Sequence, residues 1–139
     1  MNAVDTNIFV YSLDKHEPVK QQKARDLLQL LGVDSSTTVL LWQVIGELIQ
    51  RLRHWRDQGK LNEAEFLQLV AIHRRLFSLV LPTPAVLDHA LDLVAKYSLS
   101  HWDSMVLGAC LDANVTTFYT EDIGAPRTIA GIQLVNPFV

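Results

Sequence analysis

Four acidic residues stand at positions that indicate shared chemistry, although they lie far apart along the chain. They are Asp5, Glu47, Asp103 and Asp122. Asp5 is the most unusual because it interrupts the apolar segment 2–11, and burying an ionised carboxylate without a partner is costly. The neighbouring Asn7 offers hydrogen bonds but no positive charge. We therefore expect another partner for Asp5.

The elements that position these acids follow from the hydrophobic pattern. Short apolar runs alternate with helical patterns, and strands are predicted near residues 2–4, 37–41, 79–81, 115–119 and 132–135. This alternation predicts an α/β fold in one domain, residues 1–139: a three-layer α/β/α sandwich with a short parallel sheet. Ligands of such folds gather beyond the carboxyl ends of the strands. Asp5 and Asp122 follow predicted strands and the other two acids lie in predicted helices, so all four can converge there.

Local signals predict where several helices begin and end. Helical patterns begin near Pro18, Leu41, Asn62, Thr83 and Ser100. Gly32 and Gly59 are expected to end two of them. Asn62 and Glu65 have the spacing of a capping box. The segment 120–131 contains Gly and Pro and is predicted to be a loop.

Three of the acids also have explanations that involve no chemistry. Asp103 fits a capping box begun by Ser100, and spacing alone favours that role. Glu47 can pair with Arg51 one helical turn later. Asp122 can be an ordinary loop residue. None of these explanations extends to Asp5.

Four convergent carboxylates would repel one another unless a cation lay among them. Two unit charges about 4 Å apart interact by about 4 kcal/mol at an effective dielectric constant near 20. Oxygen ligands select hard ions, and Mg²⁺ usually binds few carboxylates, keeps several waters and contacts substrate phosphates. The sequence therefore predicts an Mg²⁺ site that also accepts Mn²⁺.

Composition argues against several other classes of protein. The net charge is −3 and there is one cysteine, Cys110, so neither a disulfide framework nor the strong positive field of a duplex-binding domain is expected. No zinc-site spacing, glycine-rich phosphate loop or nucleophile elbow occurs. No apolar run approaches the ~20 residues of a membrane span and no signal peptide is evident, so we expect a soluble, cytoplasmic protein.

Basic residues cluster in the middle third of the chain, where a solvated helix face is favoured over a phosphate-binding surface. The cluster comprises Arg51, Arg53, His54, Arg56, Lys60, Arg74 and Arg75. Contact of this cluster with a phosphate backbone stays open on the sequence alone. The same holds for His101, next to the predicted helix turn that carries Asp103.

Segments of the sequence resemble the PIN-domain family, in particular the VapC-like ribonuclease toxins of bacterial toxin–antitoxin pairs. They are VDTNIFVYSLD, QVIGELIQ, LSHWDSMVLGAC, and FYTEDIG followed by GIQLVNPF. The resemblance spans the whole chain and implies a PIN-like fold. It implies that the four acids form the catalytic quartet that binds Mg²⁺ or Mn²⁺. The polar positions that support them are Thr6, Asn7 and Thr120.

The resemblance implies a metal-dependent endoribonuclease that hydrolyses RNA phosphodiester bonds as the toxin of a pair. Asp5 and Asp103 would be the main metal ligands, while Glu47 and Asp122 would hold the remaining waters and orient the nucleophile. Because water attacks in place of the ribose 2′-hydroxyl, the expected products carry a 5′-phosphate and a 3′-hydroxyl. Two alternatives remain open: a catalytically silent PIN-like RNA- or protein-binding module, and an acid-cluster Mg²⁺-dependent phosphatase.

The partners implied by the resemblance are RNA, a cognate antitoxin and a second copy of the chain. The antitoxin would place an Arg or Lys over the acidic site, because a cationic side chain can neutralise the same carboxylates as a metal. Four apolar helix residues allow two interpretations, a groove for the antitoxin or ordinary core packing. They are Leu48, Leu52, Phe66 and Leu69.

Overall fold

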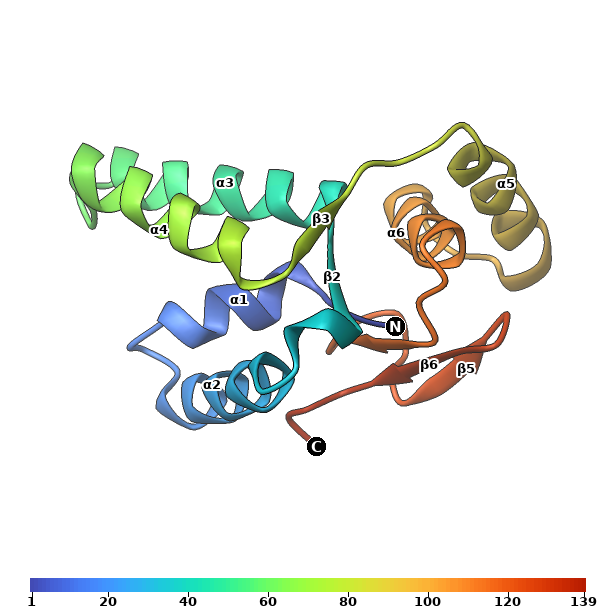
Figure 1. Ribbon diagram of the computed structural model, residues 1–139, viewed down its shortest axis with the longest axis horizontal. Helices are drawn as coiled ribbons and strands as arrows, with labels where there is room; N and C mark the ends of the chain where they lie inside the picture. Colours follow the sequence, from blue (N-terminus) through green and yellow to red (C-terminus); the bar gives the residue numbers. More distant parts are fainter.

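A six-stranded sheet with helices on both sides forms the centre of the computed structural model, which describes residues 1–139 (Figure 1). The strand order is β3-β2-β1-β4-β6-β5. The strands are β1 (Asn2–Val4), β2 (Thr38–Leu41), β3 (Ser78–Val80), β4 (Thr117–Tyr119), β5 (Arg127–Ile129) and β6 (Ile132–Val135). All neighbouring strands are parallel except β5 and β6. The predicted α/β fold is confirmed, and its sheet is mostly parallel.

The edge strand β5 corrects the sequence prediction, which places a loop at these residues. Arg127 pairs with Leu134 and Ile129 with Ile132 in antiparallel register. Ala130 and Gly131 both have positive φ, which suits the tight turn of a two-residue hairpin. Ile129 is fully buried. A three-residue strand at a sheet edge carries too little periodic pattern to be detected beside a Gly and a Pro.

Six α-helices and one short 3₁₀ helix surround the sheet. They are α1 (Thr6–Leu13), α2 (Pro18–Gly32), η1 (Ser35–Thr37), α3 (Trp42–Asp57), α4 (Glu63–Leu76), α5 (Ala85–Tyr97) and α6 (His101–Asp112). Figure 1 shows α3 and α4 side by side as one pair, and α5 and α6 as another. None of the helices combines the length and apolar character that a membrane span requires.

Local signals set several helix ends as predicted. Asn62 Oδ1 accepts from the Glu65 backbone N–H at 2.8 Å, and Glu65 Oε1 accepts from the Asn62 N–H at 3.0 Å, which confirms the capping box of α4. Helix α2 begins at Pro18 and ends at Gly32. Gly59 follows the end of α3 with a φ of +77°, a conformation that favours glycine.

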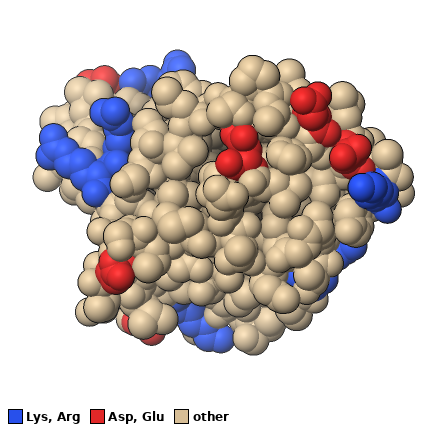
Figure 2. Space-filling view, turned by 45° about the vertical axis from the view of Figure 1, so that its right-hand side comes forward, with Lys and Arg blue, Asp and Glu red and all other residues tan.

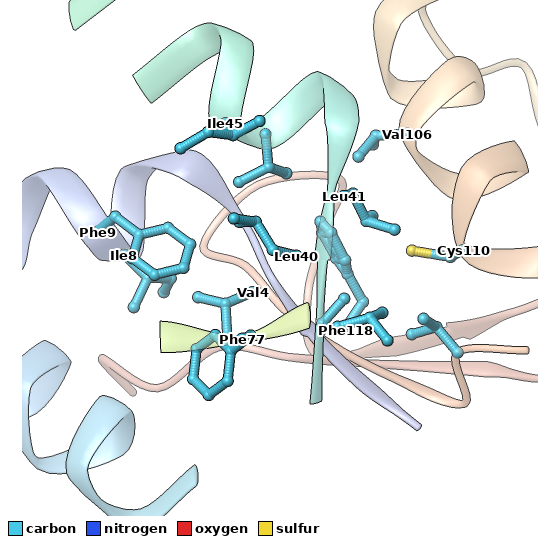
Figure 3. Close-up of a cluster of buried hydrophobic side chains, with 14 of the residues drawn as sticks. Val4, Ile8, Phe9, Leu40, Leu41, Ile45, Phe77, Val106, Cys110 and Phe118 are labelled. Carbon is cyan, nitrogen blue, oxygen red and sulfur yellow. The ribbon is translucent and has the colours of Figure 1, made fainter. Parts of the chain in front are cut away.

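The hydrophobic core lies between the sheet and the helices. Figure 3 shows apolar side chains from β1, β2, β4 and the adjoining helices gathered there, with Cys110 among them. Burial raises the pKa of the Cys110 thiol, consistent with its predicted role as a small core residue. Leu48, Leu52 and Phe66 are buried in the same core. Leu69 is half-buried and packs against this core. Of the two interpretations of these four residues, the structure supports core packing.

The parallel strands bring their carboxyl ends to one edge of the sheet. Asp5 follows β1, Trp42 begins α3 directly after β2, and Thr120 follows β4. The Asp5 backbone N–H donates to the Tyr119 carbonyl at 2.9 Å, which joins the ends of β1 and β4. Residues distant in sequence therefore meet at this edge.

Candidate active site

Asp5 directly follows β1 and caps the N-terminus of α1. Its Oδ1 accepts from the Thr6 backbone N–H at 2.7 Å, and its Oδ2 accepts from the Thr120 hydroxyl at 2.7 Å. The Thr120 oxygen in turn accepts from the Asp122 backbone N–H at 3.0 Å. This chain of hydrogen bonds fixes the Asp5 carboxylate against the loop that follows β4.

No cation forms an ion pair with Asp5. The pKa of Asp5 is raised from 3.8 to about 6, mainly by burial and to a smaller extent by the nearby charges of Glu47 and Asp122. The hydrogen bonds from Thr120 and Thr6 oppose this rise. The partners of Asp5 within the chain are therefore neutral donors, and its negative charge remains uncompensated.

Glu47 lies in α3 and faces α1. Its Oε2 accepts from the Thr6 hydroxyl at 2.8 Å, and its Oε1 accepts from the Gln43 side chain at 2.9 Å. The predicted alternative, an ion pair between Glu47 and Arg51, does not form. Thr6 thus contacts two acids at once, Asp5 through its backbone and Glu47 through its side chain.

Asp122 lies in the exposed loop after β4 and is held by α1. The Asn7 side-chain amide donates to Asp122 Oδ2 at 2.8 Å. The other Asn7 side-chain atom, Oδ1, is buried and has no hydrogen-bond partner. A buried carbonyl oxygen without a donor is rare in folded proteins and marks a place where a cation or water can bind.

Asp103 lies in the first turn of α6. Its backbone N–H donates to the Ser100 hydroxyl at 3.3 Å, so Ser100 caps the helix as predicted. The Asp103 carboxylate does not complete a capping box, in contrast to Glu65 in α4. Asp103 is half-buried and is absent from the lining of the pocket that contains the other three acids. The structure thus brings Asp5, Glu47 and Asp122 together in one pocket and leaves Asp103 outside its lining, with a carboxylate that is not used for capping.

An open pocket of about 1020 Å³ contains the convergent acids. Its acidic residues are Asp5, Asp14, Glu17, Glu47, Glu121 and Asp122, and Arg51 is its one basic residue. Thr6 and Asn7 also line it. Such an excess of negative charge repels an RNA phosphate unless cations accumulate in the pocket.

Glu121 is an acid of this pocket that the sequence did not single out. Lys20 of α2 forms an ion pair with it at 2.9 Å, and the Tyr11 hydroxyl donates to it at 2.7 Å. Although burial acts to raise the pKa of Glu121, the bonds from Lys20 and Tyr11 hold it below its usual value. The three side chains join α1 and α2 to the loop that carries Asp122. No local pattern predicts this cluster, because Lys20 and Glu121 are distant in sequence.

The residues present fit a hard divalent cation. Every candidate ligand is an oxygen atom, as Mg²⁺ and Mn²⁺ prefer, and the buried Asn7 Oδ1 lacks a partner. No three His, Cys, Asp or Glu side chains are already arranged around one point as a ready-made metal site. The carboxylate and amide oxygens that line the pocket are the ligand type that Mg²⁺ takes, usually with several waters retained.

A family model for the PIN domain matches residues 3–130. The chain belongs to the PIN-domain family. Solved structures similar to this PIN domain include a toxin–antitoxin complex from Klebsiella pneumoniae, with 15% identity and a TM-score of 0.70 over 99% of this chain and 98% of that one. No curated protein sequence matches it.

Two further structures share the fold. The first is VapBC2 from Rickettsia felis, bound to a DNA fragment from its promoter, with 18% identity and a TM-score of 0.69 over 96% of both chains. The second is VapC20 from Mycobacterium tuberculosis, described as a sarcin-ricin loop cleaving toxin, with 12% identity and a TM-score of 0.66 over 96% of this chain and 99% of that one. At these identities the similarity establishes a common fold, with helices around a mostly parallel sheet.

Proposed function

We propose that this PIN domain is a divalent-metal-dependent endoribonuclease and the toxin of a toxin–antitoxin pair. The observation that carries the proposal is the half-buried Asp5 carboxylate, which lies at the strand edge with Glu47 and Asp122 nearby and with no cation paired to it. The family match favours a nuclease over the alternative of a phosphatase. The toxin structures of the same fold support the toxin role.

Asp5 and Asp103 would hold the metal ion, with Asn7 Oδ1 able to accept from one of the metal's waters. When bound, Mg²⁺ or Mn²⁺ would neutralise phosphate charge and lower the pKa of the attacking water. Glu47, fixed by Thr6 and Gln43, would orient that water by accepting its proton in a hydrogen bond. Asp122 would help to hold hydration water at the open side of the pocket.

The hydrogen-bonded supports keep these carboxylates in position without neutralising them. Thr6 binds both Asp5 and Glu47, Thr120 binds Asp5, and Asn7 binds Asp122. Loss of groups that orient metal ligands typically costs about 10- to 100-fold in metal affinity or activity. These neutral residues are therefore positioning residues in the proposed mechanism.

A cognate antitoxin, a homodimer and a cytoplasmic location complete the proposal. The excess of acids in the pocket suits an antitoxin Arg or Lys. Helix α5 exposes a row of apolar side chains at helical spacing, which suits contact with a second copy of the chain. The row comprises Leu87, Leu91 and Val94.

The test is cleavage of a single-stranded RNA by the purified protein with Mn²⁺, with Mg²⁺ and with excess EDTA. We expect cleavage with either metal, none with EDTA, and products that carry a 5′-phosphate and a 3′-hydroxyl. Asp5→Asn protein purified in the same way controls for contaminating nucleases, and Asp92→Asn, an exposed acid on α5, controls for a general effect of charge. Absence of cleavage across varied RNA sequences would favour the silent binding module.

A further inference from the structure

A second, apolar cleft lies beside the acidic pocket. Its volume is about 220 Å³, and most of its lining is hydrophobic. The lining comes from β2, from β3 and the segment that follows it, and from the helices α3, α5 and α6. Gln43 and Trp102 line both cavities. The two cavities are therefore neighbours with a common wall, and a molecule that fills one is in reach of the other.

Two exposed tryptophans flank this cleft. Trp42 is the first residue of α3 and is 54% exposed, and Trp102 lies in the first turn of α6 and is 63% exposed. The His101 ring packs edge-on against the Trp102 ring with centroids 4.5 Å apart. Large aromatic side chains in the first turns of two helices present rigid flat surfaces to solvent at little cost in conformational entropy.

The cleft carries almost no free charge. Asp112, its one ionisable residue, accepts from the Thr83 hydroxyl at 2.8 Å and from the Thr83 backbone N–H at 3.2 Å. The Gln43 amide donates to Glu47 and to the Trp102 carbonyl. Figure 2 shows a face that is mostly free of charged side chains at its centre, with acidic and basic groups in its upper part and near its edges. A neutral, flat, apolar group fits these walls better than a phosphate or a charged peptide.

We propose that this cleft binds an unpaired nucleobase of the RNA whose phosphate occupies the acidic pocket. The inference rests on the proposed nuclease function and assigns the substrate a second point of attachment. A base and its phosphate belong to one nucleotide unit, so adjoining apolar and acidic cavities with a shared Trp102 wall match the two ends of that unit. Stacking on aromatic side chains tolerates every base, because each has a flat π surface.

A nucleobase accounts for the position and the size of the cleft, which a protein partner would not require. The shared wall places the cleft next to the acids, whereas the apolar row of α5, which suits a second copy of the chain, does not line the cleft. The cleft is also small, as suits a single ring system. It selects single-stranded RNA, since a base must leave its stack to enter it.

The decisive residue is Trp42, because it lines the apolar cleft and not the acidic pocket. Affinity for a short single-stranded RNA is measured with Ca²⁺ in place of Mg²⁺ or Mn²⁺, so that a hard cation can fill the acidic pocket while binding is separated from cleavage. We expect Trp42→Leu and Trp102→Leu each to raise Kd roughly 5- to 100-fold, the effect of losing one stacked base. Leu67→Ala, an exposed apolar residue on α4, serves as the matched control and should leave Kd unchanged.

A scan with abasic nucleotides identifies the base itself. One abasic position should weaken binding by the wild type, and the same position should have no further effect on Trp42→Leu. Unchanged Kd in Trp42→Leu with normal binding by the wild type would overturn the proposal. So would conversion of a dimer to a monomer by Trp42→Leu with Kd unaffected, which would assign the cleft to an interface between copies.

Failure of the nuclease proposal gives a different pattern. If the wild type never cleaves RNA with Mn²⁺ or Mg²⁺ but binds it in a Trp42-dependent way, the base site stands and the chain is a binding module. If cleavage is normal and neither tryptophan substitution changes Kd, the nuclease proposal holds and the base-site proposal is wrong.

Discussion

Asp5 and Glu121 are carboxylates of one pocket, and their surroundings shift their pKa values in opposite directions. Glu121 is paired with Lys20, accepts from Tyr11, and has a lowered pKa. Asp5 receives only neutral donors, and burial raises its pKa to about 6. Lys20 pairs with Glu121, whereas no cation pairs with Asp5, and Arg51, the one basic residue that lines the pocket, forms an ion pair with neither acid.

The difference separates a structural acid from a proposed functional one. An ion pair at Glu121 attaches α1 and α2 to the loop after β4, and this needs no ligand. An uncompensated charge at Asp5 costs stability in the free protein, and a bound cation would remove that cost. Functional sites commonly retain such unfavourable groups.

Asp5→Asn should reduce RNA cleavage to background while leaving the metal-free protein as stable as the wild type or more stable. The substitution removes a charge that is buried and repelled by Glu47 and Asp122. Cleavage with Mn²⁺ and thermal melting of the same preparation test both parts. Cleavage at the wild-type rate would exclude Asp5 from the site, and joint loss of cleavage and fold would make it a structural residue.

Asp103→Asn should lower the cleavage rate strongly and raise the Mn²⁺ concentration required for activity. Because the Asp103 carboxylate does not complete a capping box, we expect its loss to change the free energy of unfolding by no more than about 0.5 kcal/mol. Glu65→Ala in α4 is the contrasting variant, since it breaks a complete capping box and should cost roughly 0.3–1.5 kcal/mol. Normal activity of Asp103→Asn would remove it from the proposed quartet.

The stability of the metal-free wild type should fall between pH 4 and pH 7 relative to Asp5→Asn. Since the pKa of Asp5 is about 6 in the folded protein and 3.8 ordinarily, protonation favours the folded state. The favourable contribution is complete below pH 3.8 and is lost as the pH rises through 6. Linkage predicts a relative change of about 2–3 kcal/mol across this window, measured by urea unfolding at several pH values. A constant difference between the two proteins would contradict the raised pKa.

Lys20→Met should have the smallest effect. The variant leaves Glu121 with the Tyr11 hydrogen bond but without its cation, so the pocket becomes more negative. We expect Mn²⁺ affinity to change by no more than about fivefold, toward tighter binding. The matched control is Arg56→Met. It breaks the ion pair between Arg56 and Glu63, and neither of these residues lines the pocket. Loss of Mn²⁺ binding in Lys20→Met would contradict the distinction between Glu121 as a structural acid and Asp5 as a functional one.

The sequence predicted those parts of the fold that short-range patterns encode. Helix starts at Pro18 and Asn62, the end of α2 at Gly32, and the alternation of strands with helices all follow from local signals. Strand β5 was missed because its three residues have no periodicity and are defined by pairing with β6. Asp5 was recognisable because it interrupts a buried segment.

Long-range contacts were beyond prediction from spacing. The sequence left open whether Glu47 pairs with Arg51, and the structure resolves this by bringing Thr6 and Gln43 to Glu47 instead. It gave no sign of the bond between Lys20 and Glu121, because that bond depends on how α2 packs near the loop after β4. The apolar cleft was not predicted either, because its walls come from four separate stretches of the chain, at residues 41–43, 80–82, 86 and 102–112.

Calorimetric titration of Mn²⁺ into the metal-free protein tests the central claim most directly. The account predicts that the wild type binds Mn²⁺ at pH 7, that affinity falls about tenfold at pH 5 because Asp5 is then largely protonated, and that Asp5→Asn does not bind. Equal binding of Mn²⁺ by the wild type and Asp5→Asn, or no binding by the wild type at pH 7, would contradict it.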